Sequence, residues 1–168
     1  MNKNIVLIGF MGCGKSTIGR MLAQKLSYKW IDIDHRIEKQ ENATVVEIFA
    51  ARGEKHFRKL ESAVVQELEH TSRAVITTGG GTAENLENMA LLRKNSMIIY
   101  LKCGAEILYP RISKNNRRPM ADGKSYEEIA AMLAEREHFY TQCNCEIDIS
   151  ELSPLQTVRK ILSYYTRF

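Results

Sequence analysis

The residues with the clearest chemistry lie near the N-terminus, where Gly9–Thr17 reads Gly-Phe-Met-Gly-Cys-Gly-Lys-Ser-Thr. This stretch contains the pattern G-x-x-x-x-G-K-[ST] and directly follows the apolar run Ile5–Ile8. A strand that leads through a glycine-rich loop into a helix presents backbone N–H groups and a positive helix end to an anion. In such a loop Lys15 reaches the β- and γ-phosphates, and the Ser16 hydroxyl ligates magnesium. The sequence therefore predicts a nucleoside triphosphate site. Its predicted members are Gly12, Cys13, Gly14, Lys15, Ser16 and Thr17.

Two carboxylates, Asp32 and Asp34, stand at the end of a second predicted strand, residues 30–33. Ligands of a parallel α/β sheet bind beyond the carboxyl ends of its strands, and alternation points both side chains the same way. Magnesium with bound phosphates would compensate the two charges, so we assign Asp32 to the metal together with Ser16, with Asp32 bound through water because this ion keeps much of its hydration shell. Asp34 is then free to accept a hydrogen bond or a proton from an acceptor hydroxyl. The alternative, which can coexist with this role, is that Asp34 caps a helix beginning at His35.

Two arginines and three glycines are candidates for an acceptor pocket. Arg58 follows the glycine break at Gly53, and Arg136 lies in Arg136-x-x-x-Tyr140. An arginine fork matches a carboxylate with two parallel hydrogen bonds, so two converging arginines would define a pocket for a carboxylic acid. Taken singly, each fits a surface ion pair better, and spacing does not show that they converge. Gly79–Gly81 ends an apolar run, where bare backbone allows a ligand to approach closely.

The elements that must position these residues alternate along the chain. Hydrophobic periodicity and helix-start signals predict them. The strands are predicted at residues 4–8, 30–33, 74–78, 97–101 and 146–149, and the helices at 15–26, 44–52, 54–69, 85–93, 105–112, 125–143 and from 153 onward. Such alternation predicts an α/β fold, a parallel sheet with helices on both faces. We expect one domain over residues 1–168, with a polar stretch at 114–124 that suits a mobile lid.

Composition narrows the class of protein. The apolar fraction is 44%, the charged fraction is 26% and the net charge is +4, which is too small and dispersed to indicate nucleic acid. No apolar stretch approaches the ~20 residues that span a bilayer, so no membrane partner is expected. The four cysteines form no disulfide or zinc pattern, which favours a reduced, cytoplasmic setting. No coiled-coil seam demands a partner, and we expect a monomer.

Together these features resemble the shikimate kinases, from the first strand to the last helix. Six motifs occur in order, and jointly they are far more specific than the phosphate loop alone. They are Gly9–Thr17, Asp32-Ile-Asp34, Gly53-Glu-x-x-Phe-Arg58, Gly79–Gly81, Arg118-Pro119 and Arg136-x-x-x-Tyr140.

The resemblance implies the three-layer P-loop kinase fold of the nucleoside monophosphate kinases, with five parallel strands, a lid at about 114–124 and a substrate-binding region at about 34–61. It implies transfer of a phosphoryl group from ATP, with Mg²⁺, to the 3-hydroxyl of shikimate, in the aromatic amino acid pathway. The implied catalytic residues are Lys15, Asp34 and Arg118. The implied shikimate ligands are Asp34, Arg58, Gly79, Gly80, Gly81 and Arg136, with Phe49 and Phe57 as an apolar wall. Arg111, Arg118 and Pro154 join the phosphate loop in binding ATP.

Some alternatives remain open. Arg117 doubles the lid arginine, and Pro119 favours Arg118 as the residue that reaches the phosphate. A P-loop kinase of another small hydroxylated acceptor would share the fold but would not be expected to carry the same aspartate, arginine and glycine set. A GTPase would normally carry N-K-x-D, and Asn2-Lys3-Asn4-Ile5 lacks the aspartate. A non-catalytic nucleotide-binding module is the remaining alternative.

Overall fold

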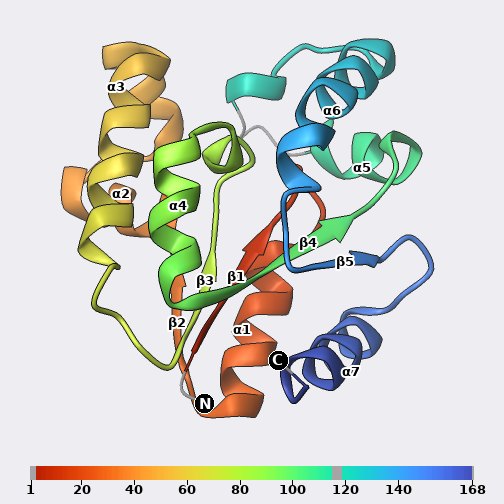
Figure 1. The fold of residues 1–168 in the computed structure, drawn as a ribbon. Helices are drawn as coiled ribbons and strands as arrows, with labels where there is room; N and C mark the ends of the chain where they lie inside the picture. Colours follow the sequence, from red (N-terminus) through yellow and green to blue (C-terminus); the bar gives the residue numbers. More distant parts are fainter. Residues whose placement is uncertain (1–2, 115–118, 168) are drawn as a thin grey trace.

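The core of the protein is a parallel sheet. The computed structural model describes residues 3–114 and 119–167. Its five strands pair in the order β2-β3-β1-β4-β5, and every neighbouring pair is parallel (Figure 1). This arrangement confirms the predicted α/β class with five parallel strands. The strands are β1 (Asn4–Ile8), β2 (Lys29–Asp32), β3 (Ala74–Thr77), β4 (Ser96–Lys102) and β5 (Cys145–Asp148).

Helices cover both faces of the sheet. Parallel strands need crossover connections, and here α1 packs with α7 on one face and α3 with α4 on the other (Figure 1). The helices are α1 (Lys15–Leu26), α2 (Ile33–Glu41), α3 (Val45–Glu67), α4 (Leu86–Lys94), α5 (Ala105–Ile112), α6 (Tyr126–Tyr140) and α7 (Pro154–Tyr165), with the 3₁₀ turns η1 (Thr82–Glu84) and η2 (Pro119–Ala121).

Burial on both faces explains the composition of the central strands. Every residue of β1 and of β3 is buried, and all but the last residue of β4 are buried. A strand covered on both sides reads as a continuous apolar run rather than an alternating one. The core therefore runs through the middle of the sheet, and the ends of the strands are left for the site.

The helix-start signals are confirmed. Thr44, Ser125 and Ser153 each cap a helix through a complete capping box. The two helices predicted at 44–52 and 54–69 form α3, which is interrupted where Gly53 adopts φ 74° and ψ 173°. This is a left-handed conformation that glycine adopts at little cost, and it redirects the segment carrying Arg58.

One local prediction is wrong and matters for the site. The second strand ends at Asp32, and Ile33 already belongs to α2. Asp32, not Asp34, caps α2, because its side chain accepts a hydrogen bond from the His35 N–H. Asp34 therefore lies in the first helical turn, and its carboxylate is free of the capping role.

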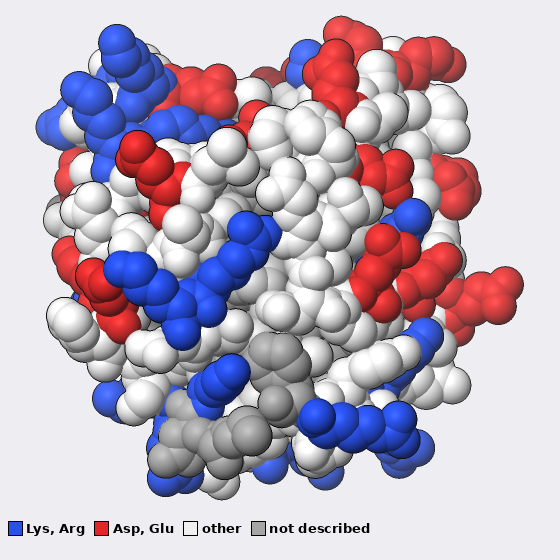
Figure 2. Space-filling view, in the orientation of Figure 1, with Lys and Arg blue, Asp and Glu red and all other residues white. Residues whose placement is uncertain are grey.

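Charged residues of both signs occupy the surface. On the face shown in Figure 2, basic side chains lie in several groups, at the upper left, across the middle and along the lower edge, and acidic side chains are numerous on the right, so the basic residues do not form one continuous area there. No described helix combines the length and apolar character that a membrane crossing requires.

Candidate active site

The phosphate loop connects β1 to α1 through glycines in special conformations. Gly9, Gly12 and Gly14 have φ of 144°, 84° and 94°, a region that residues with a Cβ rarely adopt. Gly14 is the N-cap of α1 and supplies no side-chain cap, so the first amides of the helix are open to an anion. The local backbone matches the prediction from the glycine pattern.

Lys15 lies folded over this loop. Its ammonium group donates hydrogen bonds to the carbonyls of Gly9 at 2.7 Å and Phe10 at 2.9 Å, and the residue is only 8% exposed. These contacts fix a positive charge at the loop without a carboxylate partner among the described residues. A buried cation of this kind can form a strong charge-assisted hydrogen bond to a phosphate group.

A cavity opens beside the loop. Its walls combine glycines, hydroxyls and charged groups from several strand ends. It is lined by Gly12, Gly14, Lys15, Ser16, Thr17, Asp32, Asp34, Glu38, Val45, Thr78, Gly79, Gly80 and Arg111. Arg111 also donates to the Gly12 carbonyl at 3.4 Å. The cavity brings most of the predicted ATP ligands together.

Two of the predicted ATP residues that the structure describes do not line this cavity. Cys13 is buried, and Pro154 is the first residue of α7. Contact of the nucleotide with either residue stays a prediction.

Asp32 and Ser16 form a compact oxygen cluster. The Ser16 hydroxyl donates to Asp32 Oδ2 at 2.7 Å, and the Thr77 hydroxyl donates to the same oxygen at 2.8 Å. Oδ1 accepts from the His35 amide at 3.1 Å. Hydroxyl and carboxylate oxygens are suitable Mg²⁺ ligands, and this ion takes few protein ligands besides phosphates and water. The residues present therefore fit the predicted metal site.

The carboxylate of Asp34 is buried and electrostatically unusual. Its Oδ1 atom has no hydrogen-bond partner among the described residues. Burial, and then the negative charges of Asp32 and Glu61, raise the pKa of Asp34 from 3.8 to about 7, although Lys15 and Arg58 act in the opposite direction. A carboxylate that titrates near neutral pH can accept a proton from a hydroxyl and release it again.

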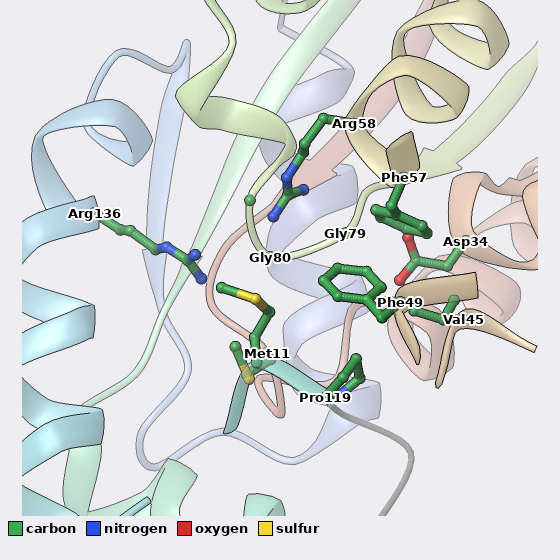
Figure 3. Close-up of a pocket in the computed structure, with 12 residues that line it drawn as sticks. Met11, Asp34, Val45, Phe49, Phe57, Arg58, Gly79, Gly80, Pro119 and Arg136 are labelled. Atoms are coloured by element: carbon green, nitrogen blue, oxygen red, sulfur yellow. The ribbon is translucent and has the colours of Figure 1, made fainter. Parts of the chain in front are cut away.

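A second pocket adjoins the first, and it contains both predicted arginines. Figure 3 shows their guanidinium groups pointing toward the glycine loop, with Asp34, Phe49 and Phe57 on another side of the pocket. The two phenylalanine rings lie 4.9 Å apart, centroid to centroid. The pocket is lined by Met11, Asp34, Val45, Phe49, Phe57, Arg58, Gly79, Gly80, Gly81, Pro119, Met120 and Arg136. The convergence that spacing alone could not establish is present in the structure.

Acidic side chains hold the two arginines. Arg58 donates from NH1 to Glu61 at 3.0 Å and from NH2 to Glu54 at 3.1 Å. Arg136 pairs through Nε with Glu84 at 2.7 Å, while its NH1 group is buried without a partner among the described residues. A buried unpartnered N–H group is costly unless a ligand satisfies it. The pocket is therefore equipped for an anionic group.

The three glycines leave room for this network. A Cβ on Gly79 would lie 2.9 Å from Asp34 Oδ1, and one on Gly81 would lie 2.3 Å from Arg58 NH2. The Tyr140 hydroxyl donates a hydrogen bond to the Gly80 carbonyl. Side chains at these positions would displace the groups that face the pocket.

Three residues that help to hold the arginine pocket, Glu61, Thr82 and Glu84, were not predicted from the sequence. Glu61 and Thr82 are completely buried, and the Thr82 hydroxyl donates to Glu61 at 2.5 Å. The i, i+3 spacing from Arg58 to Glu61 is a usable signal for their pairing. Glu84 gave no comparable signal, because it lies far along the chain from Arg136.

The lid prediction is only partly within the described residues. Pro119 and Met120 line the second pocket. Arg117 and Arg118 lie outside the described residues, so the choice between them stays a prediction.

Comparison with known proteins places this site in a family. The family model described as shikimate kinase matches residues 11–166. The shikimate kinase of Geobacter metallireducens is 40% identical over 163 residues, which cover 96% of this chain and 91% of that protein. The structure of the Acinetobacter baumannii shikimate kinase in complex with shikimate superposes with a TM-score of 0.94 at 31% identity, covering 99% of this chain and 94% of that one. The Aquifex aeolicus enzyme gives a TM-score of 0.86 at 31% identity, covering 97% and 96%. The chain belongs to the shikimate kinase family.

Proposed function

We propose that this protein transfers the γ-phosphoryl group of ATP to the 3-hydroxyl of shikimate, forming shikimate 3-phosphate and ADP. The observation that carries the proposal is that Asp34 lines both pockets, and that Gly79 and Gly80 do so as well. A hydroxyl held at Asp34 would stand at the boundary between the phosphate loop and the arginine pocket. Phosphoryl transfer depends mainly on such alignment and on charge neutralisation.

The phosphate loop would hold and neutralise the nucleotide. The amides at the start of α1 and the Lys15 ammonium would contact the β- and γ-phosphates. Ser16 and Asp32 would hold Mg²⁺, Asp32 through water, and when bound this ion would supply positive charge that neutralises the phosphates. Arg111 and the region of Pro154 would lie near the adenine.

Asp34 would act on the attacking hydroxyl. Because its Oδ1 is unpartnered, it can accept a hydrogen bond from the 3-hydroxyl without breaking one made within the protein. Its pKa of about 7 lets it carry the proton once the oxygen attacks phosphorus. The proton moves from the hydroxyl to Asp34, the new O–P bond forms and ADP leaves.

The acceptor's carboxylate would bind between Arg58 and Arg136. Both guanidinium groups line the same pocket, and the unpartnered NH1 of Arg136 supplies a donor that no described residue uses. Phe49 and Phe57 would pack against the ring, and the Gly79–Gly81 backbone would approach its hydroxyls. Arg118, which lies outside the described residues, would neutralise the transferring phosphate as the lid of 114–124 closes.

We further propose that one chain suffices as the working unit, a single domain over residues 1–168 acting as a monomer in the cytoplasm. Measuring the molecular mass of the protein in solution during turnover tests whether the active species is a monomer.

The experiment that tests the proposed function is ADP release from ATP and Mg²⁺ with shikimate, gluconate or a nucleoside monophosphate as acceptor. Strong stimulation by shikimate alone is expected. Stimulation by another acceptor would show that the protein is a kinase whose acceptor is not shikimate. Binding of ATP without stimulation by any acceptor would favour a non-catalytic nucleotide-binding module.

A further inference from the structure

Glu84 is the partner that holds Arg136. Its Oε1 atom lies 2.7 Å from Arg136 Nε, and the Glu84 side chain is 39% exposed whereas that of Arg136 is 8% exposed. Glu84 ends η1, which begins directly after Gly81, and Arg136 comes from α6. The ion pair therefore ties the arginine to the segment that leaves the glycine loop.

Glu84 contacts one particular nitrogen atom of the Arg136 guanidinium group. Glu84 occupies Nε, so the NH1 atom at the end of the fork is left buried and unpartnered. The guanidinium carbon also lies 5.8 Å from the centre of the Phe10 ring, which limits the side chain from another direction. An arginine has many rotamers to lose on binding, and a carboxylate that fixes one of them in advance lowers that cost.

Arg58 is held differently. Its Glu61 partner is 1% exposed and is also bonded to Thr82, and its Glu54 partner is on the same helix one turn away. Arg58 is thus fixed largely from within α3. Within the described part of the chain, Arg136 pairs with a single carboxylate, which another element contributes.

We infer that Glu84 is a positioning residue that presents Arg136 to the carboxylate of the acceptor. The inference rests on the proposed function. Two effects oppose each other: the carboxylate of Glu84 orients Arg136, and its negative charge repels an anionic ligand. Because Glu84 is partly exposed, solvent screens the repulsion, whereas the 2.7 Å contact to Nε is direct. Orientation therefore dominates.

The test compares Glu84→Ala, Glu84→Gln and Glu87→Ala in steady-state assays. Glu87 borders the same outer cavity as Glu84 and forms no ion pair within the described part of the chain, so it is a matched control for loss of charge. Glu84→Ala should raise KM for shikimate about tenfold while kcat and KM for ATP change less than about twofold. Glu84→Gln keeps an acceptor for Nε and should recover most of the loss. Glu87→Ala should match the wild type.

A ligand change separates orientation from general damage. The methyl ester of shikimate lacks the charged carboxylate, so the ratio of KM values between Glu84→Ala and wild type should fall toward one with the ester. An equal loss with acid and ester would overturn the inference, as would a lower KM for shikimate in either Glu84 variant. An unchanged KM in Glu84→Ala would overturn it too. If the wild-type protein itself shows no stimulation by shikimate, the proposed function fails instead.

Discussion

The two halves of the site are built in different ways. The phosphate half is built mainly on one continuous stretch, Gly9–Thr17, whose shape is set by backbone conformation and helix geometry, with Asp32 and Arg111 added from other elements. The acceptor half gathers Asp34, Arg58 and Arg136 from α2, α3 and α6, and side-chain pairs hold it together. We therefore expect changes in the phosphate half to lower kcat with any acceptor. Changes at the two arginines should act mainly on the binding of the acid.

The largest expected effect is in the phosphate half. Lys15→Ala removes the buried cation that is bonded to the Gly9 and Phe10 carbonyls. We expect kcat to fall by more than about a thousandfold, because the charge on the transferring phosphate loses its fixed neutralising group. ADP release under saturating ATP and shikimate measures this. If Lys15→Ala changed only KM for shikimate and left kcat unchanged, the proposed functional division between the two halves would be contradicted.

The next effect concerns Asp34, which belongs to both halves. Asp34→Asn keeps the size of the side chain but cannot accept a proton, so kcat should fall about a hundredfold or more. In the wild type, kcat/KM for shikimate should rise with pH through about 7, since the ionised carboxylate is the active form. This rise should be absent in the variant. Near-normal turnover of Asp34→Asn would remove the base from the mechanism.

Within the acceptor half, the two arginines should have similar effects on binding but different effects on stability. Arg136→Met and Arg58→Met should each raise KM for shikimate about thirtyfold or more, with smaller changes in KM for ATP. Arg58→Met should also lower the free energy of unfolding by about 2 kcal/mol, because it leaves the buried Glu61 without its ion-pair partner. Arg136→Met should cost less stability, since Glu84 is partly exposed and can be hydrated. Urea unfolding measures both; equal stability losses would contradict the asymmetry.

The last expected effect concerns stability rather than turnover: Asp34→Asn should gain stability in a pH-dependent way. The pKa of Asp34 is about 7 in the folded protein against an ordinary 3.8, so the folded state binds the proton more tightly than the unfolded state. The wild type therefore loses stability as pH rises from about 4 to 7, and Asp34→Asn does not share this loss. The shift from 3.8 to about 7 corresponds to roughly 4 kcal/mol, so the variant should be more stable than the wild type by up to about 4 kcal/mol at pH 8 and by little at pH 4. If the gain in stability of Asp34→Asn did not depend on pH, it would show that burial does not raise the pKa of Asp34.

The same contrast explains what sequence reasoning could predict. Periodicity and capping residues identified the five strands and every helix except α2 to within a few residues, because those signals are local; β1, α1 and α5 match their predicted ranges. The phosphate loop was predictable for the same reason. The end of the second strand was not, because a short half-buried strand passes into α2 without a break, and alternation wrongly suggested that Asp32 and Asp34 leave the strand together.

The acceptor pocket was harder to predict. Arg58, Arg136 and the glycines could be named from their motifs, but their convergence depends on how α3 and α6 pack beside η1. Of the partners that hold them, Glu61 could be inferred from its i, i+3 spacing to Arg58, whereas Glu84 can be identified only when the chain is folded. Long-range pairs of charges carry no periodic signal, which is why spacing left the arginines as candidates for surface ion pairs.

The most direct measurement is phosphorus–proton correlation NMR on the product formed from shikimate, ATP and Mg²⁺. Our proposal places the reacting hydroxyl beside Asp34 and the carboxylate between the two arginines, so it predicts one new phosphomonoester whose phosphorus couples to the proton on C3 of the ring. Coupling to a different ring proton would contradict this orientation. Release of inorganic phosphate with no phosphorylated acceptor would contradict the proposed transfer itself.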